Sequence, residues 1–283
     1  MLRIGTCSWK YDSWKGIVYP DKEELNYLAE YSKHFNTVEV DQWFWSLFEP
    51  KKAVLPSKDD VEFYTNSVPD DFKFTIKIPN SLTLTHFYNR DKSSMLTPNP
   101  YFLDKDLFDS FIHSLEPMRN KIGVLMFQLE YLNQQKVRSL NEFLDKFEKF
   151  ISSIDKKHIL GVEIRNPNYL KKSYFDFLER NDLSVVLLQG YYMPPIWDVL
   201  YQYKEQIKGT VIIRLHGPDR LGIENKSKKI WNKIIESKEY ELSKVAEIIN
   251  YLETKKVDTY VNVNNHYEGS APLTIQKINK LIK

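Results

Sequence analysis

The sequence contains few cysteines and glycines, and this scarcity excludes several kinds of protein. Among 283 residues there are one cysteine, Cys7, and nine glycines. A single cysteine cannot form an intramolecular disulfide and offers no CxxC pair for structural zinc. We therefore predict that Cys7 is a small buried apolar side chain rather than a reactive thiol.

Glycine-rich phosphate-binding motifs are also absent. The chain has no GxGxxG and no GxxxxGK[ST], and it lacks the GxSxG of serine hydrolases. These motifs bring backbone N–H groups to phosphates or expose a nucleophile on a sharp turn. Their absence argues against dinucleotide, nucleoside-triphosphate and serine-hydrolase chemistry.

Long hydrophobic runs and a strong net charge are missing as well. The longest apolar runs, such as IGVLMF at 122–127, fall far short of the roughly 20 residues that span a bilayer. The first residues lack the apolar region of a signal peptide, so we expect a cytoplasmic protein with no membrane partner. With 40 basic and 38 acidic residues, the composition neither indicates nor excludes a nucleic-acid partner.

What the sequence does contain is a regular alternation of short β-rich runs with longer segments of helical period. This alternation is typical of parallel β/α construction, and an α/β barrel needs about 250 residues. We predict one domain, 1–283, folded as a single (β/α)8 TIM-type barrel with parallel strands; an open doubly wound sheet is the alternative. The expected strands are 2–8, 37–41, 72–78, 123–129, 159–165, 184–189, 211–217 and 259–265.

Amphipathic segments lie between these strands and should form the outer helices. One further helix should begin after Pro56, because proline is tolerated only in the first turn of a helix. The other expected helices are 21–35, 104–116, 134–151, 171–181, 195–207, two within 226–255, and 272–282.

Pairs of polar residues occur late in four of the expected strands. The pairs are Glu39 and Asp41, Glu163 and Arg165, Arg214 and His216, and Asn262 and Asn264. Residues two apart in a strand share a face, so these side chains should point into the barrel or surround its C-terminal end. In a TIM barrel that end carries the functional site.

We predict from this pattern a polar site at the C-terminal face. Glu163, His216 and Glu39 are the candidate catalytic acids and bases. Candidate ligand-binding residues are Arg165, Arg214, Asn264, Asn265, Lys77 and Gln128. The alternative for any one pair, for example Glu163 with Arg214, is a structural ion pair inside the barrel.

No cofactor is predicted from these residues, although a divalent metal is chemically possible. Glu39, Glu163 and His216 are acceptable ligand types, and Asp41 and His266 would add two more. There is no HExxH motif, and the nearby arginines would repel a cation. We therefore assign no metal ligands.

Tryptophans gather after the first two expected strands. Trp9 and Trp14 follow the first strand and Trp43 follows the second, which places them at the same end as the polar pairs. We predict that they form an aromatic wall against which a sugar or a nucleobase could stack. The alternative is that the rings only cover the end of the barrel.

A series of short segments resembles one known family along almost the whole chain. The segments are IGTCSW, FNTVEVD, FKFTIKIP, FQL, VEIRNP, RLHGP and YVNVNN. Their order is similar to that of the domain of unknown function 72 family, the YecE-like proteins. The resemblance implies a TIM-type barrel, sometimes described as sugar-isomerase-related, with no established reaction. Family-like positions fall on Glu39, Lys77, Gln128, Glu163, Arg165, Arg214, His216, Gly217, Asn264 and Asn265.

The functional hypothesis is an enzyme, an isomerase or a hydrolase, that acts by general acid/base chemistry. Its ligand should be a small polar molecule, either sugar-like or phosphorylated and therefore anionic, held by the two arginines. One alternative is a metal-dependent phosphodiesterase resembling barrel nucleases. Another is a barrel that binds a ligand or a protein without catalysis.

Overall fold

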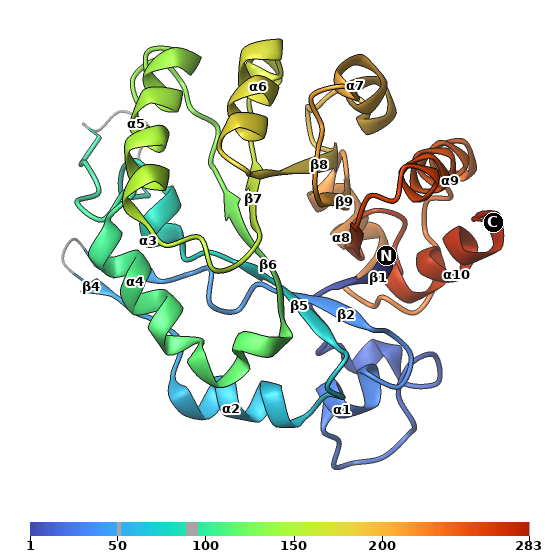
Figure 1. Cartoon of the computed structure of the whole chain (residues 1–283). Coiled ribbons are helices and arrows are strands. Elements are labelled where there is room, and N and C mark those ends of the chain that lie inside the picture. Colours follow the sequence, from blue (N-terminus) through green and yellow to red (C-terminus); the bar gives the residue numbers. More distant parts are fainter. Residues whose placement is uncertain (50–51, 89–95, 283) are drawn as a thin grey trace.

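Eight parallel strands close into a barrel in this computed structural model, which describes residues 1–49, 52–88 and 96–282 (Figure 1). The strands are β1 (Leu2–Cys7), β2 (Thr37–Val40), β5 (Lys73–Lys77), β6 (Ile122–Gln128), β7 (Leu160–Glu163), β8 (Ser184–Gly190), β9 (Val211–Gly217) and β10 (Thr259–Val263). The last strand, β10, pairs with β1, so that Leu2 lies opposite Thr259 and Thr6 opposite Val263. This closure confirms the predicted TIM-type barrel.

Helices surround the barrel, and one small hairpin interrupts the alternation (Figure 1). The helices are α1 (Tyr27–Tyr31), α2 (Lys58–Asn66), α3 (Asn80–Thr83), α4 (Lys105–Ser114), α5 (Leu140–Ser153), α6 (Lys172–Arg180), α7 (Ile196–Tyr203), α8 (Arg220–Ser227), α9 (Glu239–Thr254) and α10 (Ala271–Leu281). Short 3-10 turns are η1 (Asp12–Trp14), η2 (Glu116–Lys121) and η3 (Pro167–Tyr169). An antiparallel pair, β3 (Leu47–Glu49) and β4 (Lys52–Ala53), lies between β2 and α2.

Three helices begin elsewhere than predicted, because the capping side chain differs from the expected one. Helix α1 starts after Asn26, whose side chain accepts a hydrogen bond from the Ala29 N–H, so it is shorter than 21–35. Helix α5 starts after Ser139, which caps the Glu142 N–H, not at 134. Helix α8 is capped by Asp219 and ends at Ser227, so the first helix expected within 226–255 lies earlier in the chain.

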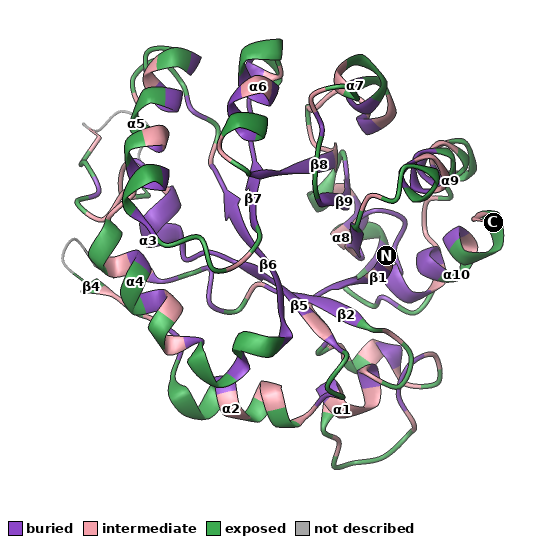
Figure 2. Ribbon diagram, in the orientation of Figure 1, coloured by how far each residue is buried: buried purple, intermediate pink, exposed green. Residues whose placement is uncertain are grey.

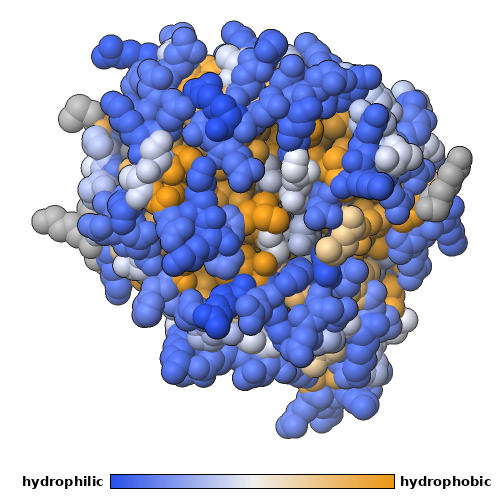
Figure 3. Space-filling model, viewed as in Figure 1, coloured by the Kyte–Doolittle hydropathy of each residue, from blue (hydrophilic) through white to orange (hydrophobic). Residues whose placement is uncertain are grey.

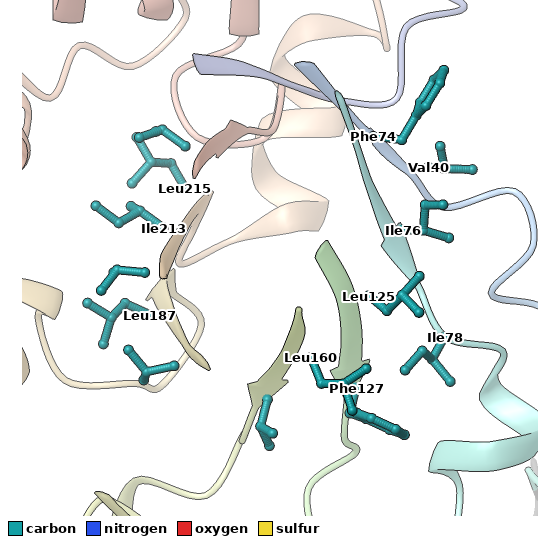
Figure 4. Close-up of a cluster of buried hydrophobic side chains, with 14 of the residues drawn as sticks. Val40, Phe74, Ile76, Ile78, Leu125, Phe127, Leu160, Leu187, Ile213 and Leu215 are labelled. Carbon is teal, nitrogen blue, oxygen red and sulfur yellow. The ribbon is translucent and has the colours of Figure 1, made fainter. Parts of the chain in front are cut away.

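The strands bury both of their faces. On the outside, aliphatic and aromatic side chains such as Phe74, Phe127 and Leu215 point away from the barrel (Figure 4). The inward sides of the helices are buried against them, whereas the outward sides are exposed (Figure 2). Inside, a separate cluster of Val124, Met126, Val186, Ile212 and Tyr260 fills part of the barrel.

Glycine makes room inside the barrel for the largest of these side chains. A Cβ on Gly123 would lie 2.7 Å from the Tyr260 hydroxyl, so only glycine leaves space for that ring. The molecular surface in Figure 3 is covered mainly by hydrophilic residues, with hydrophobic ones visible between them. Among the described residues, no helix has the length and apolar character needed to cross a membrane.

Candidate functional site

A buried arginine on β9 joins two carboxylates inside the barrel. Arg214 is 1% exposed, and Glu39 on β2 and Glu163 on β7 are fully buried. The guanidinium donates from Nε and Nη2 to the two oxygens of Glu39, at 2.7 Å each. Its Nη1 donates to Glu163 and, at 3.1 Å, to Oε1 of Gln128 on β6. Four strands are therefore tied together by one side chain.

Two further cations complete this arrangement. The Lys77 ammonium on β5 lies 3.3 Å from Oε1 of Glu39, and Nε of Arg165 donates to Oε1 of Glu163 at 2.9 Å. We call Glu39, Lys77, Glu163, Arg165 and Arg214 the ionic cluster. Within it three positive charges face two negative ones, and the carboxyl group of Asp41 also interacts electrostatically with Lys77 and Arg214.

Asn262 supports the ionic cluster from β10. Its Nδ2 donates to Thr75 Oγ1 at 2.9 Å and to Glu39 Oε2 at 3.3 Å, while its Oδ1 has no partner among the described residues. A buried polar atom without a partner is uncommon and often marks a bound water. Asn262, which lies beside Arg214 in the strand register, thus helps to fix the orientation of Glu39.

Both carboxylates of the ionic cluster are ionised at neutral pH. Burial alone would raise the pKa of Glu39, but the charges of Arg214 and Lys77 outweigh it and lower that pKa to about 2. For Glu163, burial is likewise outweighed by Arg214 and Arg165, so its pKa is also lowered. Neither group carries a proton to donate near pH 7.

Exposure differs within the ionic cluster. The side chain of Arg165 is 29% exposed and that of Lys77 is 11% exposed, whereas Arg214 is 1% exposed. The terminal nitrogens of Arg214 are taken up by Glu39, Glu163 and Gln128, as the structural ion-pair interpretation expected. Arg165 and Lys77 are therefore the cations that a ligand can reach.

His216 lies two residues after Arg214 on the same face of β9. Its Nε2 is 3.7 Å from the Cys7 sulfur, and its Nδ1 is 3.4 Å from the Tyr191 hydroxyl. Burial and the neighbouring charges of Arg214 and Lys77 lower the pKa of His216 well below its usual value. The imidazole is therefore uncharged near pH 7 and has one ring nitrogen free to accept a proton.

Cys7 is buried, as predicted, and lies next to the histidine at the end of β1. Burial, together with the negative charge of Glu39, raises the pKa of its thiol well above the usual value. A protonated buried thiol is a poor nucleophile. Its sulfur serves here as a small neighbour of the imidazole.

The ends of β8 and β9 approach each other closely, and this fixes the position of His216 and Tyr191. A Cβ on Gly190 would lie 2.4 Å from the Gly217 carbonyl oxygen, and one on Gly217 would lie 2.7 Å from the His266 oxygen. Directly after this contact Tyr191 adopts a left-handed φ of 53°, and its N–H bonds to the Gly217 oxygen at 3.0 Å. A bulky residue in this conformation is strained, and such strain gathers at functional sites.

The tryptophans are placed differently from the predicted open wall. Trp9 and Trp43 are at most 8% exposed and both pack on Tyr64 of α2, with ring centroids 4.9 and 5.2 Å away. Trp14 is fully buried beside Tyr19. Trp9 and Trp43 thus pack the loops after β1 and β2 against α2, which is what the covering alternative expected.

The asparagines after β10 serve mainly the backbone around them. Asn265 is 2% exposed and its Oδ1 accepts from the Ala271 N–H at the start of α10, while its Nδ2 has no partner among the described residues. Asn264 is half-buried and accepts from the His266 N–H. His266 itself lies 3.0 Å from Glu224 of α8, and so it is occupied away from the ionic cluster.

An aromatic cavity that sequence reasoning missed opens beside Arg165. It has a volume of about 420 Å³ and an almost entirely apolar wall. We call it the tyrosine cavity; Arg165 lines it together with Tyr131, Pro167, Leu188, Tyr191, Tyr192 and Met193. The sequence signal for this cavity was the run Tyr191-Tyr192-Met193, which follows the sixth predicted strand.

A metal ion has one conceivable location among the described residues. Ligand atoms of Cys7, Glu39 and His216 lie within 4.8 Å of one another. However, both Glu39 oxygens already accept from Arg214, and the Lys77 ammonium lies 3.3 Å away. A cation placed there would face two positive side chains, which makes this donor set unfavourable for a divalent metal.

A closed parallel barrel with a polar cluster at the carboxyl ends of its strands places this chain among the TIM-barrel proteins, whose sites lie at that end. Within that class, the chain belongs to the family described as "Protein of unknown function DUF72", whose model matches residues 3–283. This match confirms the family resemblance found in the sequence.

Individual relatives agree with this assignment. The UPF0759 protein YecE of Escherichia coli K12 is 25% identical over 173 residues, which are 61% of this chain and 51% of the relative, so the match spans about half the relative's length. A crystal structure of a DUF72 family protein from Enterococcus faecalis V583 has a TM-score of 0.69 at 19% identity, covering 100% of this chain and 95% of that one. For a DUF72 family protein from Thermotoga maritima MSB8 the values are 0.67 and 21%, with 99% and 98% coverage. At these identities the structures support the fold alone.

Proposed function

We propose that the protein is an enzyme that acts on a small anionic molecule, with Arg165 and Lys77 binding the anion and His216 transferring a proton. The observation that carries the proposal is the pair of partly exposed cations, Arg165 and Lys77, beside an uncharged histidine. An anion bound to them would offset the positive charges that lower the pKa of His216, so that the imidazole can accept a proton from the bound molecule. Glu39 and Glu163 hold the cations in place.

The geometry favours proton abstraction over acid catalysis by a carboxylate. Glu39 and Glu163 are ionised and accept hydrogen bonds from the cations, so they lack the proton a general acid needs. His216 can take up a proton and return it, which is the requirement for isomerising a hydroxy- or keto-acid or a sugar phosphate. Hydrolysis remains the second possible outcome of the same chemistry, with His216 activating water.

Anion binding is tested first, by thermal shift with phosphate, sulfate, small carboxylates and sugar phosphates. We expect bound anions to raise the melting temperature, and Arg165→Gln to weaken their binding at least ten-fold. The matched control is Arg180→Gln, because Arg180 is an exposed arginine on α6 that pairs with Glu148. Equal binding by both variants would overturn the role of Arg165.

Catalysis is tested on the molecules that bind, incubated in D2O and followed by proton NMR. Wild-type protein should exchange a carbon-bound proton or form a product, and His216→Gln should slow this at least 100-fold while changing the dissociation constant less than three-fold. Binding without exchange, isomerisation or hydrolysis would show a protein that only binds its ligand.

Metal-dependent phosphodiester hydrolysis is the second candidate; the ligand atoms of Cys7, Glu39 and His216 lie within 4.8 Å of one another, but an ion there would have to displace Arg214 and Lys77 from Glu39. It requires that Zn2+ or Mn2+ bind and that a chelator abolish hydrolysis of a phosphodiester substrate. Calorimetric titration of Zn2+ and Mn2+ into wild type and Cys7→Ala distinguishes the candidates. Cys7-dependent binding with metal-dependent hydrolysis would replace the first proposal by this one.

A further inference from the structure

The tyrosine cavity shares one side chain with the ionic cluster and approaches His216 through another. Arg165 belongs to both, and its guanidinium lies over the Tyr191 ring at 5.1 Å. Tyr191 in turn faces His216, with ring centroids 5.8 Å apart. A molecule whose anionic group binds Arg165 would therefore place the rest of its structure against the cavity wall.

The apolar wall of the tyrosine cavity favours one kind of chemical group in the ligand. Apart from Arg165, the lining side chains are three tyrosines, a leucine, a proline and a methionine. Hydroxyl groups of a sugar would lose their hydrogen bonds to water there without replacement, which costs binding energy. A flat apolar ring loses nothing comparable and gains stacking contacts with the tyrosine faces.

Size and exposure agree with a ring as occupant. A cavity on the order of 150 Å³ accommodates benzene in a protein interior, and this one measures about 420 Å³. Tyr192 is 94% exposed and Tyr131 is 58% exposed, so two aromatic side chains at this cavity remain uncovered by the rest of the protein. Both rings would be covered when a flat group enters.

We propose that the substrate is an aromatic acid: an aryl carboxylate or aryl phosphate whose charged group binds Arg165 and whose ring lies between the tyrosines. This inference rests on the proposed function and names the substrate class of that site. It replaces the sugar-like ligand expected from the sequence. The strained Tyr191 is the residue that connects ring binding to His216.

Binding of matched probes by calorimetry tests the inference. The probes are phenyl phosphate, cyclohexyl phosphate and inorganic phosphate, which share a charged group and differ in the ring. We expect phenyl phosphate to bind at least ten-fold more tightly than inorganic phosphate and several-fold more tightly than cyclohexyl phosphate. Tyr192→Ala should weaken phenyl phosphate binding about five-fold or more and leave inorganic phosphate unchanged.

Controls separate failure of this inference from failure of the proposed function. Tyr201→Ala removes an exposed tyrosine of α7 that packs on Tyr251, and it should leave all three affinities unchanged. If all three phosphates bind equally and depend on Arg165, the anion site stands and the aromatic acid is overturned. If glucose 6-phosphate binds more tightly than phenyl phosphate, the aromatic acid is again overturned. If phenyl phosphate binding depends on Tyr192 and not on Arg165, the ring site stands and the anion site of the proposed function fails.

Discussion

Arg214 and the two carboxylates that it bridges stabilise one another at the scale of single residues. In Arg214→Met, Glu39 and Glu163 would remain buried without their main partner, so we expect the free energy of unfolding to fall by roughly 3 to 5 kcal/mol. Urea denaturation followed by circular dichroism measures this loss. The surface variant Arg180→Met should change stability by less than about 1 kcal/mol.

A triple variant shows whether unpaired charge is the cause. Glu39→Gln/Glu163→Gln/Arg214→Met removes the three fully buried charges and leaves Lys77 and Arg165, which are partly exposed, without their carboxylates. It should recover a large part of the stability lost in Arg214→Met. The deficit of the single variant should also shrink as pH falls, because its unpaired carboxylates take up protons at a higher pH than in wild type. A triple variant as unstable as the single one would show that the unpaired carboxylates of Glu39 and Glu163 do not cause the loss.

His216 gives the stability of the protein a pH dependence of its own. In the folded protein the pKa of His216 lies well below its usual value, whereas the unfolded chain takes up this proton near pH 6.5. Below about pH 6.5 the unfolded state therefore binds a proton that the folded state does not. The free energy of unfolding consequently decreases as the pH decreases. The slope approaches about 1.4 kcal/mol per pH unit for one proton.

We predict that His216→Gln makes the slope between pH 6.5 and 5 shallower, while His86, His158 and His266, whose pKa values are also lowered by burial, keep part of it. Urea titrations across that range, on wild type and variant, measure it. His34→Gln, which replaces an exposed histidine near the end of α1, is the control and should keep the slope of wild type. The assignment to His216 is wrong if both variants retain the slope.

Single residues also show what the sequence could and could not reveal about the site. Alternation along the strands predicted that Glu39, Glu163 and Arg214 lie together. Residues two apart in a strand share a face, and all three lie late in their strands. The alternation could not show that Arg214 donates two hydrogen bonds to Glu39, since this pairing depends on the register of the barrel strands. Nor could it show the left-handed backbone of Tyr191, a conformation with no sequence pattern of its own.

At the scale of elements, the close approach of the end of β9 to the loop after β10 should tolerate no side chain. Gly217 and Gly209 both have left-handed φ values, 74° and 65°, but only at Gly217 would a Cβ meet backbone, at 2.7 Å. Gly209→Ala should cost about 1 kcal/mol for the backbone conformation alone. We predict that Gly217→Ala costs about 2 kcal/mol more and displaces His216.

Thermal and urea unfolding of the two alanine variants measure the difference. Equal losses of unfolding free energy would mean that the backbone around Gly217 relaxes and that its close approach to the His266 oxygen is unimportant. The same protein samples report on the site, because Gly217→Ala should weaken any activity that depends on His216 while Gly209→Ala should not.

Elements differed in how well the sequence predicted them. Strand positions were confirmed throughout the barrel, because both strand faces are buried and each strand is therefore a short run dominated by apolar residues, even where Arg214 or His216 interrupts it. The starts of α1, α5 and α8 were wrong because several residues near each start can cap a helix. Helix α8 is capped by Asp219, two residues after the end of β9, the strand that carries His216.

At the scale of the whole molecule, the ionic cluster should make unfolding cooperative. It connects β2, β5, β7 and β9, and Arg214 joins Glu39 of the N-terminal half to Glu163 of the C-terminal half, so separating the halves breaks the two buried hydrogen bonds between Arg214 and Glu39. Four of the six tryptophans lie before residue 46, so fluorescence reports mainly on the N-terminal part, whereas circular dichroism reports on all helices. We predict coincident urea transitions for the two signals, and separate midpoints would contradict this.

The distance along the chain between Glu39 and Arg214 has a consequence for protein synthesis. These partners are 175 residues apart, so β2 is synthesised long before β9. At about 5 to 20 residues per second, the nascent chain carries Glu39 without its arginine for roughly ten to thirty seconds. Over that interval Lys77 is the cation of the cluster that can pair with Glu39, and a compact N-terminal half would bury this carboxylate without the two hydrogen bonds that Arg214 donates. The pairing of Glu39 with Arg214 therefore favours completion of the barrel only after β9 has left the ribosome.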